Sequence, residues 1–415
     1  MKGKFLAVLL TLSLCLGLMA CASQSSTSTE SDATATSQET GVTEETEASD
    51  ANNTTASNNE TEYPALRVKD NLTVGYVVMD VKADSQMRSL WQAKIECARR
   101  GWTFVDGSCE GDELTRDAIN NLINQDVDVI VLGCMALMDA KVDLIQKARE
   151  AGIGVYCNDN QVVEGVVAGS TMRNGAATVD LLYQVCNDYN WDLNCCITYE
   201  NNQVNLERYK VGAGLMDNVY PNLKFLAADD TTATSTFYLQ AAYDYTQTWI
   251  QKYGDDLDCI FSTWDGEGMS AAEAISQAGD ANGDDIFVCG IDGGSSAWAY
   301  IRNNTPLRYT YSQPFELYTH NLFEIIGQLQ QEGLQPGDEG CDIQRYGDTV
   351  YASGLVTTRE NVPEVGQSVH AVFDYYGMDP EDPDAWFNWT DGPGIYYVTD
   401  GSENDSIADQ IATNS

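Results

Sequence analysis

The sequence predicts an α/β protein built from two doubly wound lobes, each with a parallel β-sheet. Three observations support this prediction. Short apolar runs alternate with amphipathic helical stretches, and this alternation occurs in two successive series. The folded part, from Leu66 to Pro363, spans roughly 300 residues, which is enough for two domains of ordinary size. Alternation of this kind places helices on both faces of a parallel sheet.

The first series runs from residue 74 to residue 156. Its predicted strands cover residues 74–78, 102–105, 127–132 and 153–156. Its predicted helices cover residues 87–100, 113–124 and 140–151. The helical pattern is clear at residues 87–100, where Leu90, Trp91, Ile95 and Ala98 recur on one side. The second series begins after Val166, and its predicted strands lie near residues 196–199, 224–227, 259–262, 286–289 and 307–311.

The N-terminus has the features of a lipoprotein export signal. Two lysines precede an apolar run at residues 5–19, which is shorter than the stretch of about 20 residues that crosses a hydrocarbon core. Ala20 before Cys21 is typical of a cleavage site. We therefore expect residues 1–20 to be removed and Cys21 to carry lipid, so that the exported protein is anchored to the outer face of the cell membrane. The alternatives are an ordinary secretory signal and a short membrane anchor.

Two further segments lie outside the predicted lobes. Residues 21–65 are rich in Ser, Thr and acidic residues and have almost no large apolar side chains, so they are predicted to form a disordered tether. Residues 363–415 form an acidic and aromatic C-terminal extension. We expect its aromatic residues Trp386, Phe387 and Trp389 to pack on the second lobe, with a membrane partner as the alternative.

The charge and the cysteines exclude several classes of function. The formal net charge is -41, from 63 acidic and 22 basic residues, so we expect no nucleic acid partner. Apart from Cys15 in the signal and Cys21, ten of the 12 cysteines remain, and several, such as Cys157 and Cys289, lie in apolar strand-like runs. These are predicted to be buried free thiols. With no CxxC pair and only two histidines, a zinc site and a cysteine–histidine protease are not expected.

Six short segments occur in an order and spacing that resemble one family. They are residues 126–131, 151–159, 207–209, 290–293, 313–316, and 354–357 with Glu360 and Asn361. On these residues the chain is similar, over about residues 71–362, to the periplasmic sugar-binding proteins of the ribose and galactose type, which are the receptors of ABC importers. Regulators of the lac-repressor type share this core, but they carry a DNA-binding helix pair where this chain has a signal and an acidic tether.

The resemblance implies the type 1 periplasmic-binding fold, in which two lobes are joined by a hinge. It assigns residues 66–168 and 313–347 to the N-terminal lobe, and residues 169–312 and 348–362 to the C-terminal lobe. Ligands of such sheets bind beyond the carboxyl ends of the strands, so the two facing lobes create one cleft.

The resemblance also implies three sugar-binding residues. Asp159 and Arg208 match positions that grip hydroxyl groups, and Asp292 matches the carboxylate of a Gly-x-Asp-Gly turn near the hinge. Carboxylate and guanidinium groups suit this task because they bind hydroxyls with two atoms in one plane. The alternatives are a helix cap for Asp159, a solvated helix residue for Arg208 and a turn residue for Asp292.

Other cleft positions depart from the family pattern. Asp84 replaces an Asn, Gln86 and Met87 replace two stacking phenylalanines, Cys134 replaces an Asn, Asn160 replaces an Arg, Trp264 replaces the Asn before Asp265, and Ser312 replaces a Gln. We expect Asp84, Gln86, Asn160, Trp264, Asp265 and Ser312 to line the cleft. Trp264 is predicted to stack on the sugar with Phe237 or Tyr238 from the opposite wall, unless it packs in the core.

A weaker similarity concerns calcium. Galactose-type members hold Ca²⁺ in an oxygen-rich loop, and the matching residues are Asp188, Asn190, Asp192, Asn194 and Asp258. Leu193 stands where the loop requires Gly, so a solvated acidic loop without a metal is the expected state, and we expect no cofactor.

No nucleophile with a base and no phosphate-binding Gly-rich loop is found, so an enzyme is not expected. The predicted function is capture of a small sugar or polyol by a monomeric binding protein, which delivers it to the permease of an ABC importer. The alternatives are reporting to a chemoreceptor or sensor kinase, and a surface module that binds glycans.

Overall fold

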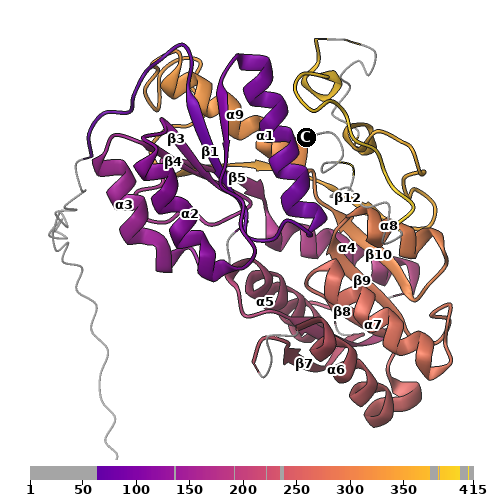
Figure 1. Cartoon of the computed structure of the whole chain (residues 1–415). Helices are drawn as coiled ribbons and strands as arrows, with labels where there is room; N and C mark the ends of the chain where they lie inside the picture. The colour runs from indigo at the N-terminus through magenta and orange to yellow at the C-terminus, as the bar shows by residue number, and fades with distance from the viewer. Residues whose placement is uncertain are drawn as a thin grey trace, which may run out of the picture. The chain divides into compact units, whose positions relative to one another are not determined.

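A computed structural model describes residues 63–134, 137–190, 192–220, 222–233, 238–373, 382, 384–401 and 410. These residues contain two six-stranded sheets, each covered by helices on both faces (Figure 1). The predicted α/β fold with two doubly wound lobes is therefore confirmed. The predicted signal, Cys21 and nearly all of the predicted tether lie outside the described residues.

The first lobe contains one wholly parallel sheet, with strand order β11-β5-β4-β3-β1-β2. Its elements are β1 (Thr73–Val77), α1 (Asp84–Arg100), β2 (Thr103–Asp106), α2 (Asp112–Asn124), β3 (Val129–Leu132), the 3-10 helix η1 (Asp139–Lys141), α3 (Val142–Glu150), β4 (Gly154–Asn158), β5 (Ala168–Met172), α9 (Phe315–Gln330) and β11 (Asp348–Ala352).

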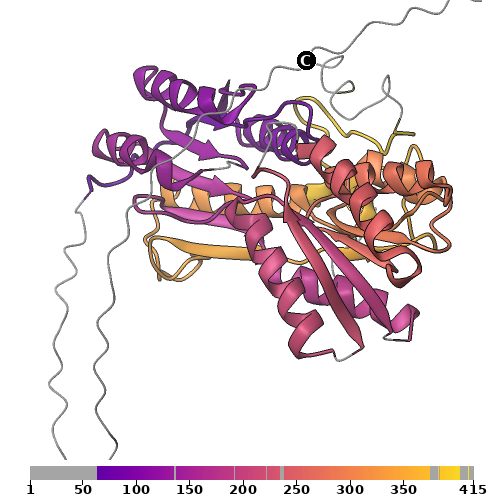
Figure 2. The ribbon, with the colours of Figure 1, turned by 90° about the horizontal axis from the view of Figure 1, so that it is seen from below.

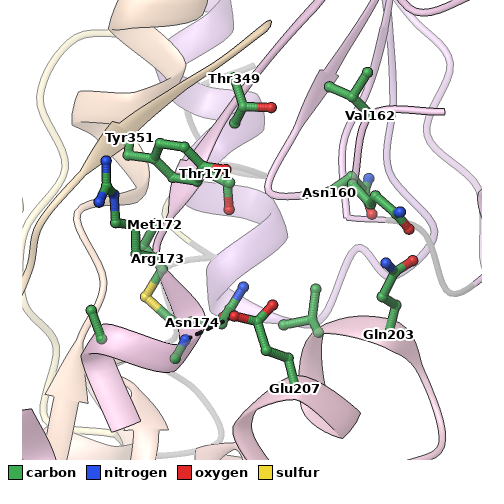
Figure 3. A pocket seen from close by; sticks show the side chains of 14 residues that line it. Asn160, Val162, Thr171, Met172, Arg173, Asn174, Gln203, Glu207, Thr349 and Tyr351 are labelled. Carbon is green, nitrogen blue, oxygen red and sulfur yellow. Dashed lines mark hydrogen bonds between the residues drawn. The ribbon is translucent and has the colours of Figure 1, made fainter. Parts of the chain in front are cut away.

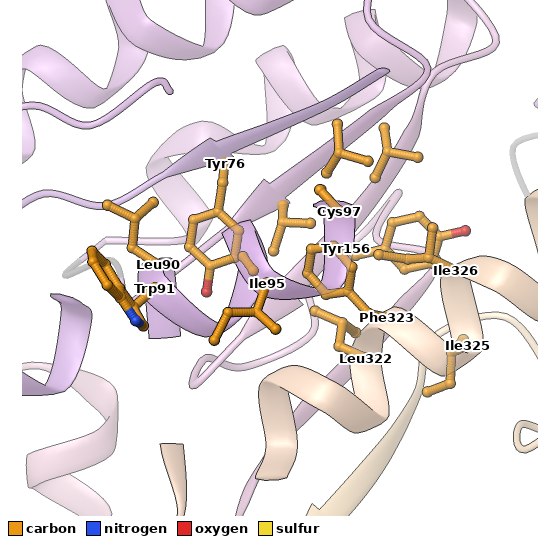
Figure 4. Close-up of a cluster of buried hydrophobic side chains, with 14 of the residues drawn as sticks. Tyr76, Leu90, Trp91, Ile95, Cys97, Tyr156, Leu322, Phe323, Ile325 and Ile326 are labelled. Carbon is orange, nitrogen blue, oxygen red and sulfur yellow. The ribbon is translucent and has the colours of Figure 1, made fainter. Parts of the chain in front are cut away.

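Both faces of the central strands β1, β3 and β4 are buried, which explains why they are mostly apolar without alternation. Successive side chains of a strand point to opposite faces. Val129 and Val131 of β3 therefore join the cluster under α1 and α9, whereas Ile130 and Leu132 join the cluster under α2 and α3. Figure 4 shows Tyr76 and Tyr156 of the sheet beside side chains of α1 and α9. Burying each such apolar side chain contributes about 1.5–3 kcal/mol.

The second lobe repeats the plan, with strand order β12-β10-β9-β8-β6-β7 and one antiparallel strand, β12. Its elements are α4 (Asn174–Asp188), β6 (Leu193–Tyr199), α5 (Gln203–Asn218), β7 (Leu223–Asp230), α6 (Tyr238–Tyr253), the 3-10 helix η2 (Gly254–Asp256), β8 (Cys259–Ser262), α7 (Asp265–Ala278), β9 (Phe287–Asp292), α8 (Ser295–Arg302), β10 (Leu307–Ser312) and β12 (Leu355–Thr357).

The chain passes between the lobes at three short connections. These are Arg173 between β5 and α4, residues 313–314 between β10 and α9, and residues 353–354 between β11 and β12. At the third, a Cβ atom on Gly354 would lie 1.9 Å from the carbonyl oxygen of Ser312, so only glycine fits there. The backbones of two connections are thus in direct contact.

These connections correct the predicted lobe boundaries. Residues 169–172 and 348–352 were assigned to the C-terminal lobe, but they pair with each other as β5 and β11 in the sheet of the first lobe. The predicted boundaries are wrong because the chain completes β5, and later β11, in the first sheet before it crosses to the second lobe.

The C-terminal segment, residues 363–401 as far as described, contacts both lobes. It contains the 3-10 helices η3 (Val369–Val372) and η4 (Trp386–Asn388). Val369, Tyr396 and Val398 belong to the apolar cluster of the first lobe. On α8 of the second lobe, Arg302 donates hydrogen bonds to the carbonyl oxygens of Pro363 at 2.7 Å and Thr399 at 2.8 Å. The segment, yellow in Figures 1 and 2, runs beside α8 in both views.

The expectation that this segment packs on the second lobe is therefore only partly correct, because the segment packs on the first lobe as well. The ring of Trp386 stacks on that of His320 from α9, with ring centroids 4.7 Å apart, and the indole nitrogen of Trp91 from α1 donates to the carbonyl oxygen of Gly394 at 2.8 Å. The three predicted aromatic residues lie against the first lobe because α1 and α9 present apolar and aromatic side chains there.

The ten cysteines among the described residues are free thiols, and eight of them are buried. Cys259 and Cys289 lie side by side in β8 and β9, with sulfur atoms 3.8 Å apart. No helix within the described ranges combines the length and the apolar character that a membrane crossing requires.

Candidate functional site

The candidate site lies where the carboxyl ends of the two sheets face each other. Asp159 follows β4 of the first lobe, and Cys134 lies just after β3. Asp292 ends β9 of the second lobe, and Glu200 follows β6. The Cys134 thiol of the first lobe lies within electrostatic range of Glu200 and Asp292 of the second. These strand ends therefore form one interlobe cleft.

Arg208 of α5 is the central cation of this cleft. Its Nε donates to Oδ1 of Asn174 at 2.9 Å, and its Nη1 donates to the carbonyl oxygen of Thr263 at 2.7 Å and to Oδ1 of Asp292 at 3.3 Å. The side chain is 2% exposed, and its Nη2 atom is buried without a hydrogen-bond partner. A buried donor without an acceptor costs about 1–3 kcal/mol, so Nη2 is positioned to bind an oxygen of a ligand.

Asp159 and Asp292 are held in unusual backbone conformations next to Arg208. Their φ angles are 53° and 145°. Oδ1 of Asp159 accepts from Oγ1 of Thr171 at 3.1 Å, and Oδ1 of Asp292 accepts from Nε2 of Gln313 at 2.6 Å. Burial raises the pKa of Asp159 to about 6, against the opposing effect of the Arg208 charge. Burial also raises the pKa of Asp292, and Arg208 again opposes the shift.

Trp264 contributes an aromatic surface to the second lobe. It precedes α7 and lies directly over Gly266, where a Cβ atom would be 2.1 Å from the indole ring. The ring of Tyr238 lies beside it, with centroids 5.9 Å apart and planes tilted by 55°. Trp264 is partly exposed, so it is not simply a core residue. Tyr238 belongs to the same lobe, which corrects the expectation of an opposite wall, and Phe237 lies outside the described residues.

Five other predicted site residues already make close contacts within the protein. Oδ2 of Asp84 accepts from the backbone N–H of Ser295 at 2.9 Å, which links α1 to α8 across the lobes. Oε1 of Gln86 accepts from the N–H groups of Met79 and Asp80 at 2.9 and 3.0 Å. Asp265 forms hydrogen bonds with Gly293 and Thr310. Ser312 forms hydrogen bonds with Trp298 and Thr357, and Asn160 forms one with Gly133. Asp84, Gln86, Asp265 and Ser312 thus shape the loops around the site.

A hollow of about 660 Å³ is lined by the sequence neighbours Asn160 and Glu207 of Asp159 and Arg208, but not by Asp159 and Arg208 themselves. Thr171 and Asn174, which bind these two side chains, belong to its wall. Figure 3 shows Asn160 and Gln203 on one side of the hollow and Arg173 and Tyr351 on the other. Its wall combines residues of the first lobe, such as Asn160 and Tyr351, with residues of α4 and α5, so a small solute there would touch both lobes.

Glu200 is a cleft residue that the sequence analysis missed. Its Oε2 accepts from Nδ2 of Asn202 at 2.9 Å. Burial, together with the negative charge of Asp292, raises the pKa of its carboxyl group to about 7, against the opposing effects of Asn202 and Trp264. Its position directly after a predicted strand was the available signal, since ligands of parallel sheets bind beyond the carboxyl ends of the strands.

The residues of the predicted calcium loop interact with each other and with the sheet. Oδ2 of Asp258 accepts from both the backbone nitrogen and Nδ2 of Asn194, at 2.7 and 2.9 Å. Oδ2 of Asp188 accepts from the hydroxyl of Tyr309 at 3.0 Å. Asn190 has a φ angle of 53° in the turn after α4, and Asp192 is exposed.

A different group, Glu96, His320 and Glu324, has ligand atoms within 4.8 Å of one another and could hold a metal by distance alone. However, Nη2 of Arg100 forms ion pairs with both carboxylates, at 3.1 Å to Oε2 of Glu96 and closely to Oε1 of Glu324. The Arg100 guanidinium group therefore already occupies both carboxylates and offsets part of their negative charge, which makes the group less suited to a metal ion.

Comparison with known proteins decides the family. The model of the periplasmic binding protein domain matches residues 76–321. The chain belongs to this family. A search of curated proteins found no match.

Solved structures of periplasmic binding proteins share the fold. A sugar transporter subunit from Rhodobacter sphaeroides is 20% identical, with a TM-score of 0.58 over 70% of this chain and 98% of that one. A solute-binding protein from Agrobacterium vitis with bound allitol is 18% identical, with a TM-score of 0.60 over 71% and 97%. One from Bacillus halodurans with bound myo-inositol is 17% identical, with a TM-score of 0.56 over 71% and 97%.

Proposed function

We propose that this periplasmic binding protein captures a small sugar or polyol between its lobes and delivers it to an ABC importer. The observation that carries the proposal is Arg208, which is buried at the facing strand ends, is fixed by Asn174, Thr263 and Asp292, and keeps Nη2 for a ligand oxygen. Bound allitol and myo-inositol in proteins of the same fold support a polyol. The partly exposed Trp264 supplies an apolar face of the kind that sugars pack against.

Capture would proceed by closure of the lobes. A solute bound by Arg208 and Asp292 of the second lobe gains Asp159 of the first lobe when the lobes approach, so the ligand favours the closed form. The three short connections supply the hinge, and the importer would recognise the closed pair of lobes. We assign no enzymatic step to the site.

The test is a thermal-shift screen of residues 66–415 against monosaccharides, disaccharides, polyols and nucleosides. A ligand at 100 times its dissociation constant adds about 2.7 kcal/mol to the folded state, so a clear rise in melting temperature is expected for one class. Arg208→Lys should weaken binding of the hit at least tenfold, because lysine lacks the planar fork. The exposed Lys210→Arg, two residues along α5, is the matched control. Unchanged affinity in Arg208→Lys would refute the assigned role.

We also propose that the protein acts as a monomer tethered through lipid on Cys21. The support for the lipid anchor is the sequence of residues 1–65 alone. Mass spectrometry of the mature N-terminus would detect a lipid on Cys21, and Cys21→Ala should release the protein from the membrane fraction. Light scattering of residues 66–415 would give the mass in solution.

A further inference from the structure

The cleft contains more carboxylates than cations. Asp159, Glu200 and Asp292 lie at the facing strand ends, and Arg208 pairs with Asp292. The charge of Arg88 also acts on Asp292, but Arg88 is already paired with Glu316. Residues 135–136 and 234–237, which the structure does not describe, carry no ionisable side chain.

Other charged residues around the cleft do not offset its excess of carboxylates. Arg173 lies at the outer wall of the hollow over the ring of Tyr351, 4.9 Å away, and the same wall contains Glu207. The exposed Lys82 shares its loop with Asp80. The cleft therefore has an excess of negative charge when its carboxylates are ionised.

Glu200 is the member of this group that lies beside aromatic rings. Its carboxylate is close enough to Trp264, Asn205 and Asp292 to interact with each electrostatically. Tyr238, whose ring contacts that of Trp264, lies near both Glu200 and Asp80, and Asp80 belongs to the first lobe. Two aromatic rings thus lie near Glu200, and Asp80 of the first lobe lies near one of these rings.

Closure on an uncharged solute would bury these carboxylates without a compensating charge, so Glu200, whose pKa is already raised to about 7 by burial and by Asp292, would have to bind a proton. An ammonium group on the solute would supply the charge. It would donate charge-assisted hydrogen bonds to a carboxylate, and it is attracted to the faces of Trp and Tyr rings.

We propose that the ligand of this cleft carries a protonated amine, and that Glu200, with the rings of Trp264 and Tyr238, binds that amine. Amino sugars and amino cyclitols are the ligand class. The inference rests on the proposed function, because Arg208 and Asp159 would bind the hydroxyl groups of the same solute. Glu200 is the residue that selects the amine over the alcohol.

The experiment compares ligands that differ only in charge. Residues 66–415 are titrated in a calorimeter with glucosamine, galactosamine and mannosamine, with the parent sugars and with the uncharged N-acetyl derivatives. We expect at least one amine to bind at least tenfold more tightly than both of its neutral counterparts. Glu200→Gln, which keeps the size of the side chain, should reduce this preference at least tenfold. The exposed Asp255→Asn is the control for net charge, and circular dichroism checks that each variant folds.

The outcomes separate the two proposals. Tight binding of a neutral sugar with no preference for its amine would overturn the amine proposal and leave sugar capture standing. An amine that binds Glu200→Gln as tightly as the unchanged protein would overturn the role of Glu200. If no member of the panel binds the folded protein, both proposals fail for these sugars.

Discussion

The guanidinium group of Arg88 and the carboxylate of Glu316 form a bidentate ion pair in which both side chains are 0% exposed. The two N–O distances are 2.7 and 2.8 Å. Arg88 also donates to the carbonyl oxygens of Gly293, in the second lobe, and Gln313, in a connection between the lobes. The hydroxyl of Tyr396 from the C-terminal segment bonds closely to the same Glu316 carboxylate. One buried ion pair thus joins α1, α9, the hinge and the C-terminal segment.

Glu316→Gln is expected to destabilise the protein strongly. The substitution leaves the Arg88 charge buried without its counter-ion, and loss of one partner of a buried pair costs about 3–5 kcal/mol. Urea unfolding followed by circular dichroism measures the change. Arg116→Ala breaks the exposed pair with Asp143 and should leave the unfolding curve unchanged. A Glu316→Gln curve that overlays the unchanged protein would show that the pair contributes nothing.

Trp386→Ala is expected to loosen the C-terminal segment. Trp386 is 6% exposed and stacks on His320, so its removal creates a cavity, and a Trp to Ala change in a core costs about 3–5 kcal/mol. Hydrogen exchange should increase at residues 369–398, and the melting temperature should fall. Tyr397→Ala, at an aromatic residue with 47% exposure in the same segment, serves as the control. Equal effects of the two changes would contradict the packing described.

Glu267→Gln is expected to change how stability depends on pH. Burial raises the pKa of Glu267 to about 8, so the folded state holds a proton that the unfolded state releases at a pKa near 4.5. The stability that this proton gives is therefore complete below about pH 4.5 and is lost as the pH rises through 8, at up to about 1.4 kcal/mol for each pH unit.

Glutamine imitates the protonated acid, so the stability of Glu267→Gln should fall less steeply with pH. Urea unfolding between pH 6.5 and 9 tests this. His370, whose pKa burial lowers to about 4, contributes only near the lower end of this range, where the unfolded histidine still binds a proton, and its contribution cancels because both proteins contain it. Parallel pH profiles of the variant and the unchanged protein would mean that Glu267 is already ionised in the folded protein.

Removal of calcium is expected to have no effect on the melting temperature. The carboxylate of Asp258 already accepts two hydrogen bonds from Asn194, and that of Asp188 accepts one from Tyr309. The measurement is a melting curve with and without a chelator, followed by excess CaCl₂. A rise of several degrees on adding calcium would instead establish the metal loop.

Much of the fold could be predicted because β3, β4 and β8 are buried on both faces and are mostly apolar, with a polar residue only at the end of β4 and of β8. β5 was harder to place. Its sequence, Ala-Gly-Ser-Thr-Met, is fully buried yet mostly small or polar, and Gly169 is required because the side chain of Val162 leaves no room for a Cβ atom. The lobe boundary next to it was therefore misplaced.

The site shows a similar limit. The resemblance to the sugar-binding family proposed Asp159 and Asp292, and the structure brings them together because the carboxyl ends of parallel strands meet at one edge. The pattern alone could not show that Asp84 binds Ser295 of the other lobe or that Ser312 binds Trp298 of its own lobe, since this depends on which groups lie opposite them in the fold. Glu200 was missed for the same reason, because its importance comes from Trp264, Tyr238 and Asp292, all distant in the sequence.

The C-terminal segment also determines when the two lobes can be completed during synthesis. The second lobe uses residues 174–312 and adds only the short β12, so most of its core is available early. The first lobe needs β11 and then Val369, Tyr396 and Val398, which are translated about 200 residues after β5. Its core therefore stays open until nearly the whole chain has left the ribosome. The lobe that begins first in the sequence finishes last.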